Sequence, residues 1–198
     1  MKFWTTAAAL MLASSAAYAD SCATGKTLTD GTLTVATGNP AYFPWVMDDA
    51  AEMGFDADHV AWIRTSFDQA IQPGAKEFDV NMQQFSITPE REEMVDFSAP
   101  YYTSAMAVLT TKSVVEAGAT ADVASLKSLI WGADANTTAV PMLGDLIAPE
   151  KSPLLYDDNA DVTAAMQAGQ IAAALFDLPT ALYLSAVVLN DGALLGQF

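Results

Sequence analysis

The sequence is poor in the residues from which most catalytic and metal sites are built. It contains one histidine, His59, and one cysteine, Cys22, and their spacing does not indicate a nucleophile with its base. Neither a Gly-x-Ser-x-Gly motif nor a glycine-rich phosphate-binding motif is present. Asp157 begins a segment like a calcium loop, but Val162 and Ala168 stand where that loop needs glycine and glutamate. We therefore expect no metal, no cofactor and no catalytic residue.

Positive charge is also scarce. The 198 residues include 8 Lys and Arg against 24 Asp and Glu, which gives a net charge of −16. Such a surface repels nucleic-acid phosphates and anionic lipid head groups, so we exclude both as partners. The acidic residues are interleaved with apolar runs, and 52% of all residues are hydrophobic. This composition indicates a folded acidic protein and not a disordered acidic tail.

Residues 1–19 have the pattern of a secretory signal peptide. Lys2 supplies the charged start, 5–17 is small and apolar, and 17–19 (Ala-Tyr-Ala) fits a cleavage site. The apolar run is too short for a membrane anchor, and no later segment is long enough to span a bilayer. We therefore expect the protein to be exported from the cytoplasm. Cys22 lies just after the predicted cleavage site. It is either a free thiol or paired with a cysteine outside this chain, and lipidation is the weaker alternative.

Short strands alternate with short helices along the rest of the chain. Runs of β-branched and apolar residues predict strands at 32–37, 59–64, 78–82, 105–110, 129–133, 154–156 and 171–177. Capping residues, prolines and glycines predict helices at 66–71, after 88, after 138, at 161–168 and from 179. This alternation predicts an α/β architecture with mainly parallel sheets. We divide it into a first lobe, 20–105, and a second, 106–198, with a surface connection at 113–123.

The stretch Gln84–Tyr102 concentrates candidate binding groups. Thr88 fits a helix N-cap and Pro89 the first helical position, which puts Arg91 in the first turn. A cation there opposes the helix dipole, at a cost of roughly a few tenths of a kcal/mol. That cost is tolerated when the guanidinium binds an anion, and the arginine fork suits a carboxylate. The alternatives are pairing with the neighbouring glutamates (Glu90, Glu92 and Glu93) or simple solvation.

Two further segments supply complementary groups. Asn136-Thr137-Thr138 opens a helix directly after a strand, where N–H and hydroxyl donors can meet an anion. Asp177 ends a strand at its carboxyl edge, where α/β sheets place ligands. Its carboxylate either holds an ammonium or caps the helix that Pro179 begins. The loop with Tyr42 and Trp45 either walls a pocket or covers the core. A site that offers hydrogen-bond donors to a carboxylate and an acidic side chain to an amine is suited to bind an amino acid.

The motifs SITPER, VDFSAPYY, ANTTA and FDLPTALY resemble those of the family 3 extracellular solute-binding proteins, which deliver amino acids to ABC importers. They stand in the family's order and span most of the chain. The resemblance implies a type II periplasmic-binding fold, with two α/β lobes that close around a hinge. It also implies a set of ligand-binding residues, namely Tyr42, Gln84, Ser86, Arg91, Thr137, Thr138 and Asp177.

The resemblance gives each of these residues a role. Arg91 and Ser86 would bind the ligand carboxylate from the first lobe, and Thr137 with Thr138 would meet it from the second. Asp177 would bind the α-ammonium. Tyr42 would lie against the ligand side chain, with Trp45 a weaker candidate, and Gln84 would add a polar contact.

Two departures from the family pattern predict an incomplete first lobe. A Gly-Phe-Glu segment with a full first helix is missing after Asp49, and the sequence stops at Phe198, where the family returns to the first lobe. In similar proteins that tail often carries a cysteine, which would account for Cys22. We expect a monomeric periplasmic protein that binds an amino acid, interacts with an ABC permease and is not an enzyme. The alternatives are a weakened fragment of such a protein and a dehydratase-like relative.

Overall fold

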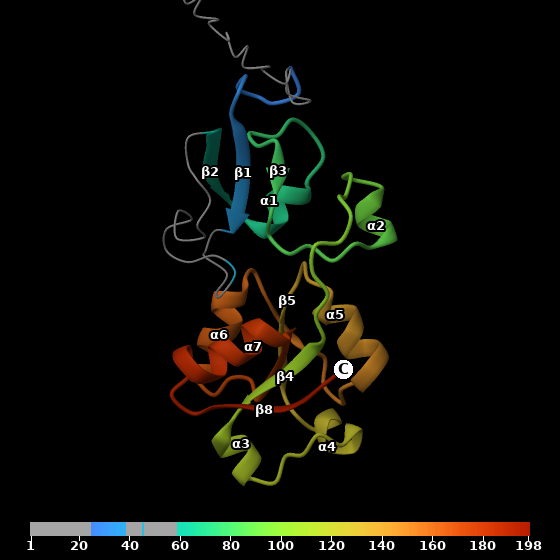
Figure 1. The fold of residues 1–198 in the computed structure, drawn as a ribbon. Coiled ribbons are helices and arrows are strands. Elements are labelled where there is room, and N and C mark those ends of the chain that lie inside the picture. The colour runs from blue at the N-terminus through green and yellow to red at the C-terminus, as the bar shows by residue number, and fades with distance from the viewer. Residues whose placement is uncertain (1–24, 39–44, 46–58) are drawn as a thin grey trace, which may run out of the picture.

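The computed structural model describes residues 25–38, 45 and 59–198 (Figure 1). They form two α/β lobes, each built on its own β-sheet, with the smaller sheet above the larger one in the view of Figure 1. The predicted two-lobe α/β architecture is therefore confirmed. The predicted signal peptide, Cys22 and Tyr42 lie outside the described residues, as does the segment after Asp49.

The first lobe contains a three-stranded parallel sheet in the order β2-β1-β3. Its strands are β1 (Leu33–Gly38), β2 (Val60–Thr65) and β3 (Val80–Asn81), and its helices are α1 (Phe67–Ile71) and α2 (Pro89–Glu92). The central strand β1 is buried after its first residue, as its unbroken apolar and threonine run predicts. Both helix caps are as predicted, because Ser66 accepts from the Gln69 amide and Thr88 from the Arg91 amide.

The second lobe contains a five-stranded mixed sheet in the order β6-β5-β7-β4-β8. Its strands are β4 (Met106–Thr111), β5 (Trp131–Asp134), β6 (Leu154–Tyr156), β7 (Ala173–Asp177) and β8 (Gly192–Gln197). β5 is parallel to β6 and β7, whereas β4 is antiparallel to β7 and β8. The prediction of mainly parallel sheets thus holds for the first lobe and for three strands of the second.

Helices cover both faces of this larger sheet. They are α3 (Lys112–Glu116), α4 (Val123–Lys127), α5 (Ala139–Met142), α6 (Asn159–Gln167) and α7 (Leu178–Tyr183), with π-helical turns η3 (Leu143–Ile147) and η4 (Leu184–Val188). Successive strand residues point to opposite faces, so Val108 packs with Trp131 and Leu143, while Leu109 packs with Phe176. The two core clusters hold the strand ends, and with them the polar residues that follow, in fixed positions.

Three local predictions differ from the structure. Helix α6 begins at Asn159 and is capped by Asp158, which accepts from the Asp161 amide at 2.9 Å, and not by Asp161 itself. The expected surface connection at 113–123 begins as helix α3. Strand β8 was not predicted, because Gly192 and Gly196 interrupt its apolar residues.

Within the described ranges, no helix combines the length and the apolar composition needed to cross a bilayer.

Candidate functional site

A cavity of about 560 Å³ lies between the two lobes and is lined by residues from both. The first lobe contributes the segments that follow β2 and β3, and the second lobe contributes the carboxyl ends of β5, β6 and β7 with the residues after them. This is where α/β sheets place their ligands, since the loops after parallel strands converge at one edge. Six of the seven predicted site residues line this cavity, namely Gln84, Ser86, Arg91, Thr137, Thr138 and Asp177. The seventh, Tyr42, lies outside the described residues.

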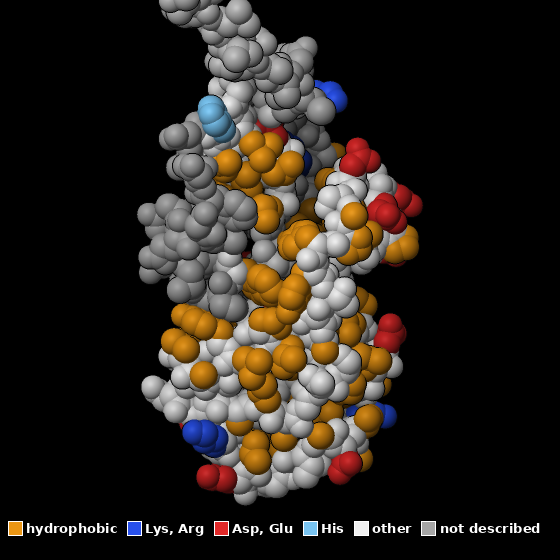
Figure 2. All heavy atoms as spheres, in the orientation of Figure 1, with side chains coloured by type: hydrophobic (Ala, Val, Ile, Leu, Met, Phe, Trp, Pro, Cys, Tyr) orange, Lys and Arg blue, Asp and Glu red, His pale blue; other side chains and the backbone are white. Residues whose placement is uncertain are grey.

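Arg91 turns inward from the first turn of α2 and is only 8% exposed. Its Nη1 donates to the Ser86 carbonyl at 2.9 Å, and its Nη2 donates to the Asn136 carbonyl at 2.9 Å. The second bond crosses from the first lobe to the second. The alternatives of glutamate pairing and solvation are therefore wrong for the guanidinium, and Figure 2 shows the acidic side chains of α2 grouped on its outer surface.

Two aromatic rings hold the guanidinium of Arg91 from the first lobe. Phe67 of α1 and Phe85 after β3 stack with ring centroids 3.8 Å apart and planes 18° apart. The guanidinium carbon lies 5.5 Å from the Phe67 centroid and 5.1 Å from the Phe85 centroid, within cation–π range. Burial lowers the pKa of Arg91, and the carboxylates of Asp134 and Glu90 oppose that shift, but an arginine remains charged.

The loop after β5 contacts Arg91 from the second lobe. Asp134, the last residue of β5, is 3% exposed, and its Oδ1 accepts from the Asn136 amide at 3.0 Å. Its carbonyl accepts from the Thr137 amide at 3.2 Å and from the Thr137 hydroxyl at 2.9 Å. Thr138 stands at the N-cap position of α5 without a side-chain cap bond, and its Oγ1 lies 3.4 Å from Ser86 Oγ of the first lobe. Asp134 thus fixes the turn that presents both threonines.

The pKa of the Asp134 carboxyl lies above the ordinary value for an aspartate. Burial raises its pKa, and the carboxylates of Asp158 and Asp157 raise it further. The Asn136 amide and the Arg91 guanidinium act in the opposite direction without cancelling the rise.

The Asp177 carboxylate accepts hydrogen bonds from both lobes. Its Oδ1 accepts from the Thr180 amide at 3.1 Å, so the predicted cap of α7 is confirmed. The same oxygen accepts from Trp45 Nε1 of the first lobe at 3.1 Å. The Trp45 ring in turn meets Tyr102 edge to face, with centroids 4.8 Å apart and planes at 70°. Asp177 is therefore both a structural cap and a contact between the lobes.

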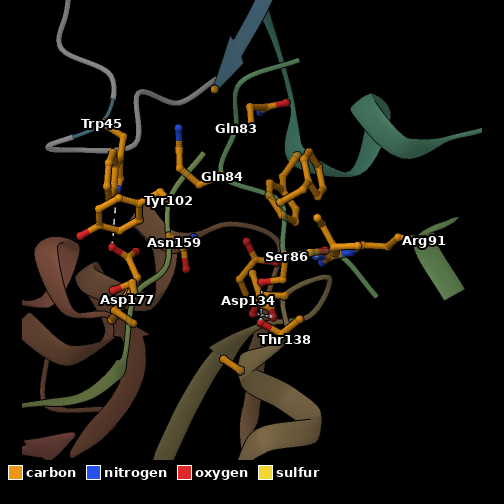
Figure 3. Close-up of a pocket in the computed structure, with 18 of the residues that line it drawn as sticks. Trp45, Gln83, Gln84, Ser86, Arg91, Tyr102, Asp134, Thr138, Asn159 and Asp177 are labelled. Carbon is orange, nitrogen blue, oxygen red and sulfur yellow. Dashed lines mark hydrogen bonds between the residues drawn. The ribbon is translucent and has the colours of Figure 1, made fainter. Parts of the chain in front are cut away.

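Figure 3 shows how these groups are distributed around the cavity. Trp45, Tyr102 and Asp177 lie at one side, and Ser86 and Arg91 lie at the other. Asn159, the first residue of α6, lies between the two groups.

Gln84 lines the cavity in a backbone conformation that few non-glycine residues adopt. Its φ is 56°, in the left-handed region, and its Nε2 donates to the Met82 carbonyl at 2.7 Å. Its Oε1 is buried without a partner among the described residues. Such strain occurs most often in functional sites, where the surrounding structure enforces it.

Sequence reasoning missed several cavity residues. Phe67 and Phe85 lie far apart in the sequence and meet only because β2 and β3 flank β1. Asp134 was detectable, since it ends a buried strand in the same way as Asp177.

Comparisons with known proteins agree with this geometry. The sequence profile of the bacterial extracellular solute-binding proteins, family 3, matches residues 43–176. A search of curated proteins found no match.

Solved structures of similar fold include amino-acid-binding proteins. An ABC transporter substrate-binding protein from Streptococcus pneumoniae, bound to L-arginine, is 27% identical, with a TM-score of 0.66 over 85% of this chain and 76% of that one. The ancestral amino-acid-binding protein AncCDT-1, a precursor of cyclohexadienyl dehydratase, is 25% identical, with a TM-score of 0.66 over 85% and 78%. A putative ABC transporter binding component from Wolinella succinogenes, complexed with lysine, shares the fold at 23% identity and TM-score 0.66, over 85% and 78%.

The profile covers more than half of the chain, and the two lobes with the cavity between them match the type II architecture of these structures. The chain therefore belongs to the bacterial extracellular solute-binding proteins of family 3.

Proposed function

We propose that the protein captures an α-amino acid in the cavity between its lobes and delivers it to the permease of an ABC importer. The observation that carries this proposal is the opposition of charges within one cavity. A buried arginine with serine and threonine hydroxyls lies at one side, and an aspartate lies at the other. A zwitterion carries the complementary pair of charges on adjacent groups.

In this proposal both lobes bind the α-carboxylate of the ligand, and the second lobe binds its α-ammonium. Arg91 and Ser86 of the first lobe (residues 20–105) bind the α-carboxylate together with Thr137 and Thr138 of the second (106–198). Asp177 binds the α-ammonium. Gln84 adds a polar contact, and Tyr42 packs against the ligand side chain.

In this proposal, ligand binding exchanges the present hydrogen-bond partners of Arg91 and Asp177 for the charged groups of the ligand. The Arg91 guanidinium bonds to the Asn136 carbonyl and Asp177 accepts from Trp45, so the lobes already contact each other through ligand-binding groups. A ligand carboxylate would replace a neutral carbonyl at Arg91 with a charged and therefore stronger acceptor. A ligand ammonium would similarly give Asp177 a charged donor.

The ligands of similar structures support an amino acid as the cargo, since arginine and lysine are bound in two of them. We further propose that the protein acts as a monomer in the periplasm and does not transform its ligand. The dehydratase alternative is tested by incubating the protein with a cyclic amino-acid precursor, where turnover would contradict this view. Permease and ATPase genes beside its own gene would support the delivery step.

The proposal is tested by isothermal titration calorimetry with the twenty amino acids on purified protein. We expect saturable binding of at least one, and loss of that binding in Arg91→Ala, since a buried charge-assisted contact is removed. Lys151→Ala, which removes an exposed cation outside the cavity, is the matched control and is expected to bind normally. Unchanged binding by folded Arg91→Ala would contradict the site assignment.

A further inference from the structure

The cavity carries more negative charge than a zwitterion can balance. Among the described residues that line it, the only basic side chain is Arg91, whereas five are aspartates: Asp68, Asp134, Asp157, Asp158 and Asp177. On the proposed function, Arg91 takes the ligand carboxylate and Asp177 takes the ammonium. Four carboxylates then remain around the ligand without a positive partner from it.

Three of these carboxylates form one acidic wall from the second lobe, made of Asp134, Asp157 and Asp158. Asp134 ends β5, and the other two follow β6, its neighbour in the sheet. Asp157 and Asp158 directly precede Asn159, which Figure 3 places between the two ends of the cavity. The acidic wall therefore lines the cavity from the second lobe, and Figure 3 shows its Asp134 beside Ser86 and Thr138, apart from Asp177.

Within this wall, Asp134 has one carboxylate oxygen that is open to the cavity. The residue is only 3% exposed, and its Oδ1 accepts from the Asn136 amide at 3.0 Å. Its Oδ2 accepts no hydrogen bond from the described residues and is not among the buried polar atoms that lack a partner, so it reaches the cavity that Asp134 lines. A cationic N–H group of a ligand would bind this oxygen as a charge-assisted donor.

We propose that the ligand is a cationic amino acid, whose side-chain ammonium or guanidinium binds the acidic wall while its α-groups bind Arg91 and Asp177. This inference rests on the proposed function and narrows it to one ligand class. A ligand with an acidic side chain would add a like charge to the wall, which is strongly disfavoured in a partly dry cavity. A ligand with an apolar side chain would bury Asp134 further and leave its Oδ2 without a donor.

The form of the wall favours an organic cation over a metal ion. In the described part of the chain, no three His, Cys, Asp or Glu side chains are grouped closely enough to hold a metal. The volume of about 560 Å³ is also ample for an amino acid with a long side chain. A ligand with two separated positive groups fits both the dispersed carboxylates and the available space.

The test compares ligands of matched shape by calorimetry on the purified full chain. Arginine and citrulline differ in that a neutral urea group replaces the guanidinium, and lysine and norleucine differ by the terminal ammonium. We expect the cationic member of at least one pair to bind about tenfold more tightly or better, since charge-assisted hydrogen bonds are roughly twice as strong as neutral ones. We also expect this preference to decline with added salt.

Two variants locate the preference. Asp134→Asn keeps an acceptor for the Asn136 amide and removes only the charge, so it should reduce the ratio of cationic to neutral affinity about tenfold or more. Asp157→Asn, an exposed position where folding is not at risk, should reduce the ratio to a smaller extent. Asp145→Asn removes an exposed acid that does not line the cavity, and it should leave the ratio unchanged.

The outcomes separate this inference from the proposed function. If neutral amino acids bind as tightly as their cationic partners, and Arg91→Ala abolishes that binding, the cationic class is wrong and the proposed function stands. If no amino acid binds the folded protein, the proposed function fails, and this inference fails with it. A cationic preference that persists in both Asp134→Asn and Asp157→Asn would refute the acidic wall as its source.

Discussion

The close contact between Gly192 and η4 gives a stability prediction whose size follows from the distances between their atoms. A Cβ at position 192, the first residue of β8, would lie 2.5 Å from Ser185 Cα, 2.6 Å from its carbonyl oxygen and 2.9 Å from its carbonyl carbon. Normal carbon contacts are about 3.5–4.0 Å, so the two segments would have to separate by about 1 Å. All three atoms are backbone, and no flexible side chain can yield. We therefore expect Gly192→Ala to destabilise the fold by about 1–3 kcal/mol.

Gly144 is the matched control within the same lobe. It lies in η3, and a Cβ added there would meet no atom within 4 Å. Gly144→Ala should therefore stabilise the protein by about 0.5–1 kcal/mol, because alanine loses less backbone entropy on folding.

Thermal melting followed by circular dichroism measures both changes. For a chain of this size, each kcal/mol moves the midpoint by about 2–4 °C, so Gly192→Ala should melt about 2–12 °C lower and Gly144→Ala about 1–4 °C higher. Equal midpoints for Gly192→Ala and the wild type would refute the packing of β8 against η4. A similar loss in both variants would show that any side chain at a glycine is harmful, whatever its surroundings.

Two further predictions concern the cavity itself. Because burial raises the pKa of Asp134, its ionised form costs stability, and that cost grows as pH rises through the folded-state pKa. Asp134→Asn should therefore melt higher than the wild type at neutral pH, with the difference vanishing below the ordinary aspartate range near about 3.9, and a pH-independent difference would contradict this. Trp45→Phe removes the donor to Asp177 and keeps an aromatic ring beside Tyr102. Small-angle X-ray scattering without ligand should show a larger radius of gyration than the wild type, and an unchanged radius would mean that this bond does not hold the lobes together.

Features set by neighbouring residues were the ones that the sequence could predict. The caps at Ser66 and Thr88 and the place of Arg91 in the first turn of α2 follow from local hydrogen bonding. The alternation of strands and helices gave the two-lobe α/β fold for the same reason, since each element has its own pattern of apolar residues.

Features set by distant contacts could not be predicted in this way. Arg91 has three glutamates beside it in the sequence, and it bonds instead to a carbonyl of the other lobe because tertiary packing removes its guanidinium from water. The ring stack that supports it joins two elements whose proximity depends on the order of the strands. Asp158 caps α6 where Asp161 was expected to do so. Both are aspartates and suit an N-cap, so only the backbone conformation decides which of them stands at the start of the helix.

The bond from Arg91 to the Asn136 carbonyl makes the cavity lining part of the connection between the lobes. The same is true of the Trp45–Asp177 bond and of the approach of Ser86 to Thr138, since all of these side chains also line the cavity. A substitution at any of these positions therefore changes the chemistry of the cavity and the contact between the lobes at the same time. Ligand affinity and the separation of the lobes should change together in such variants.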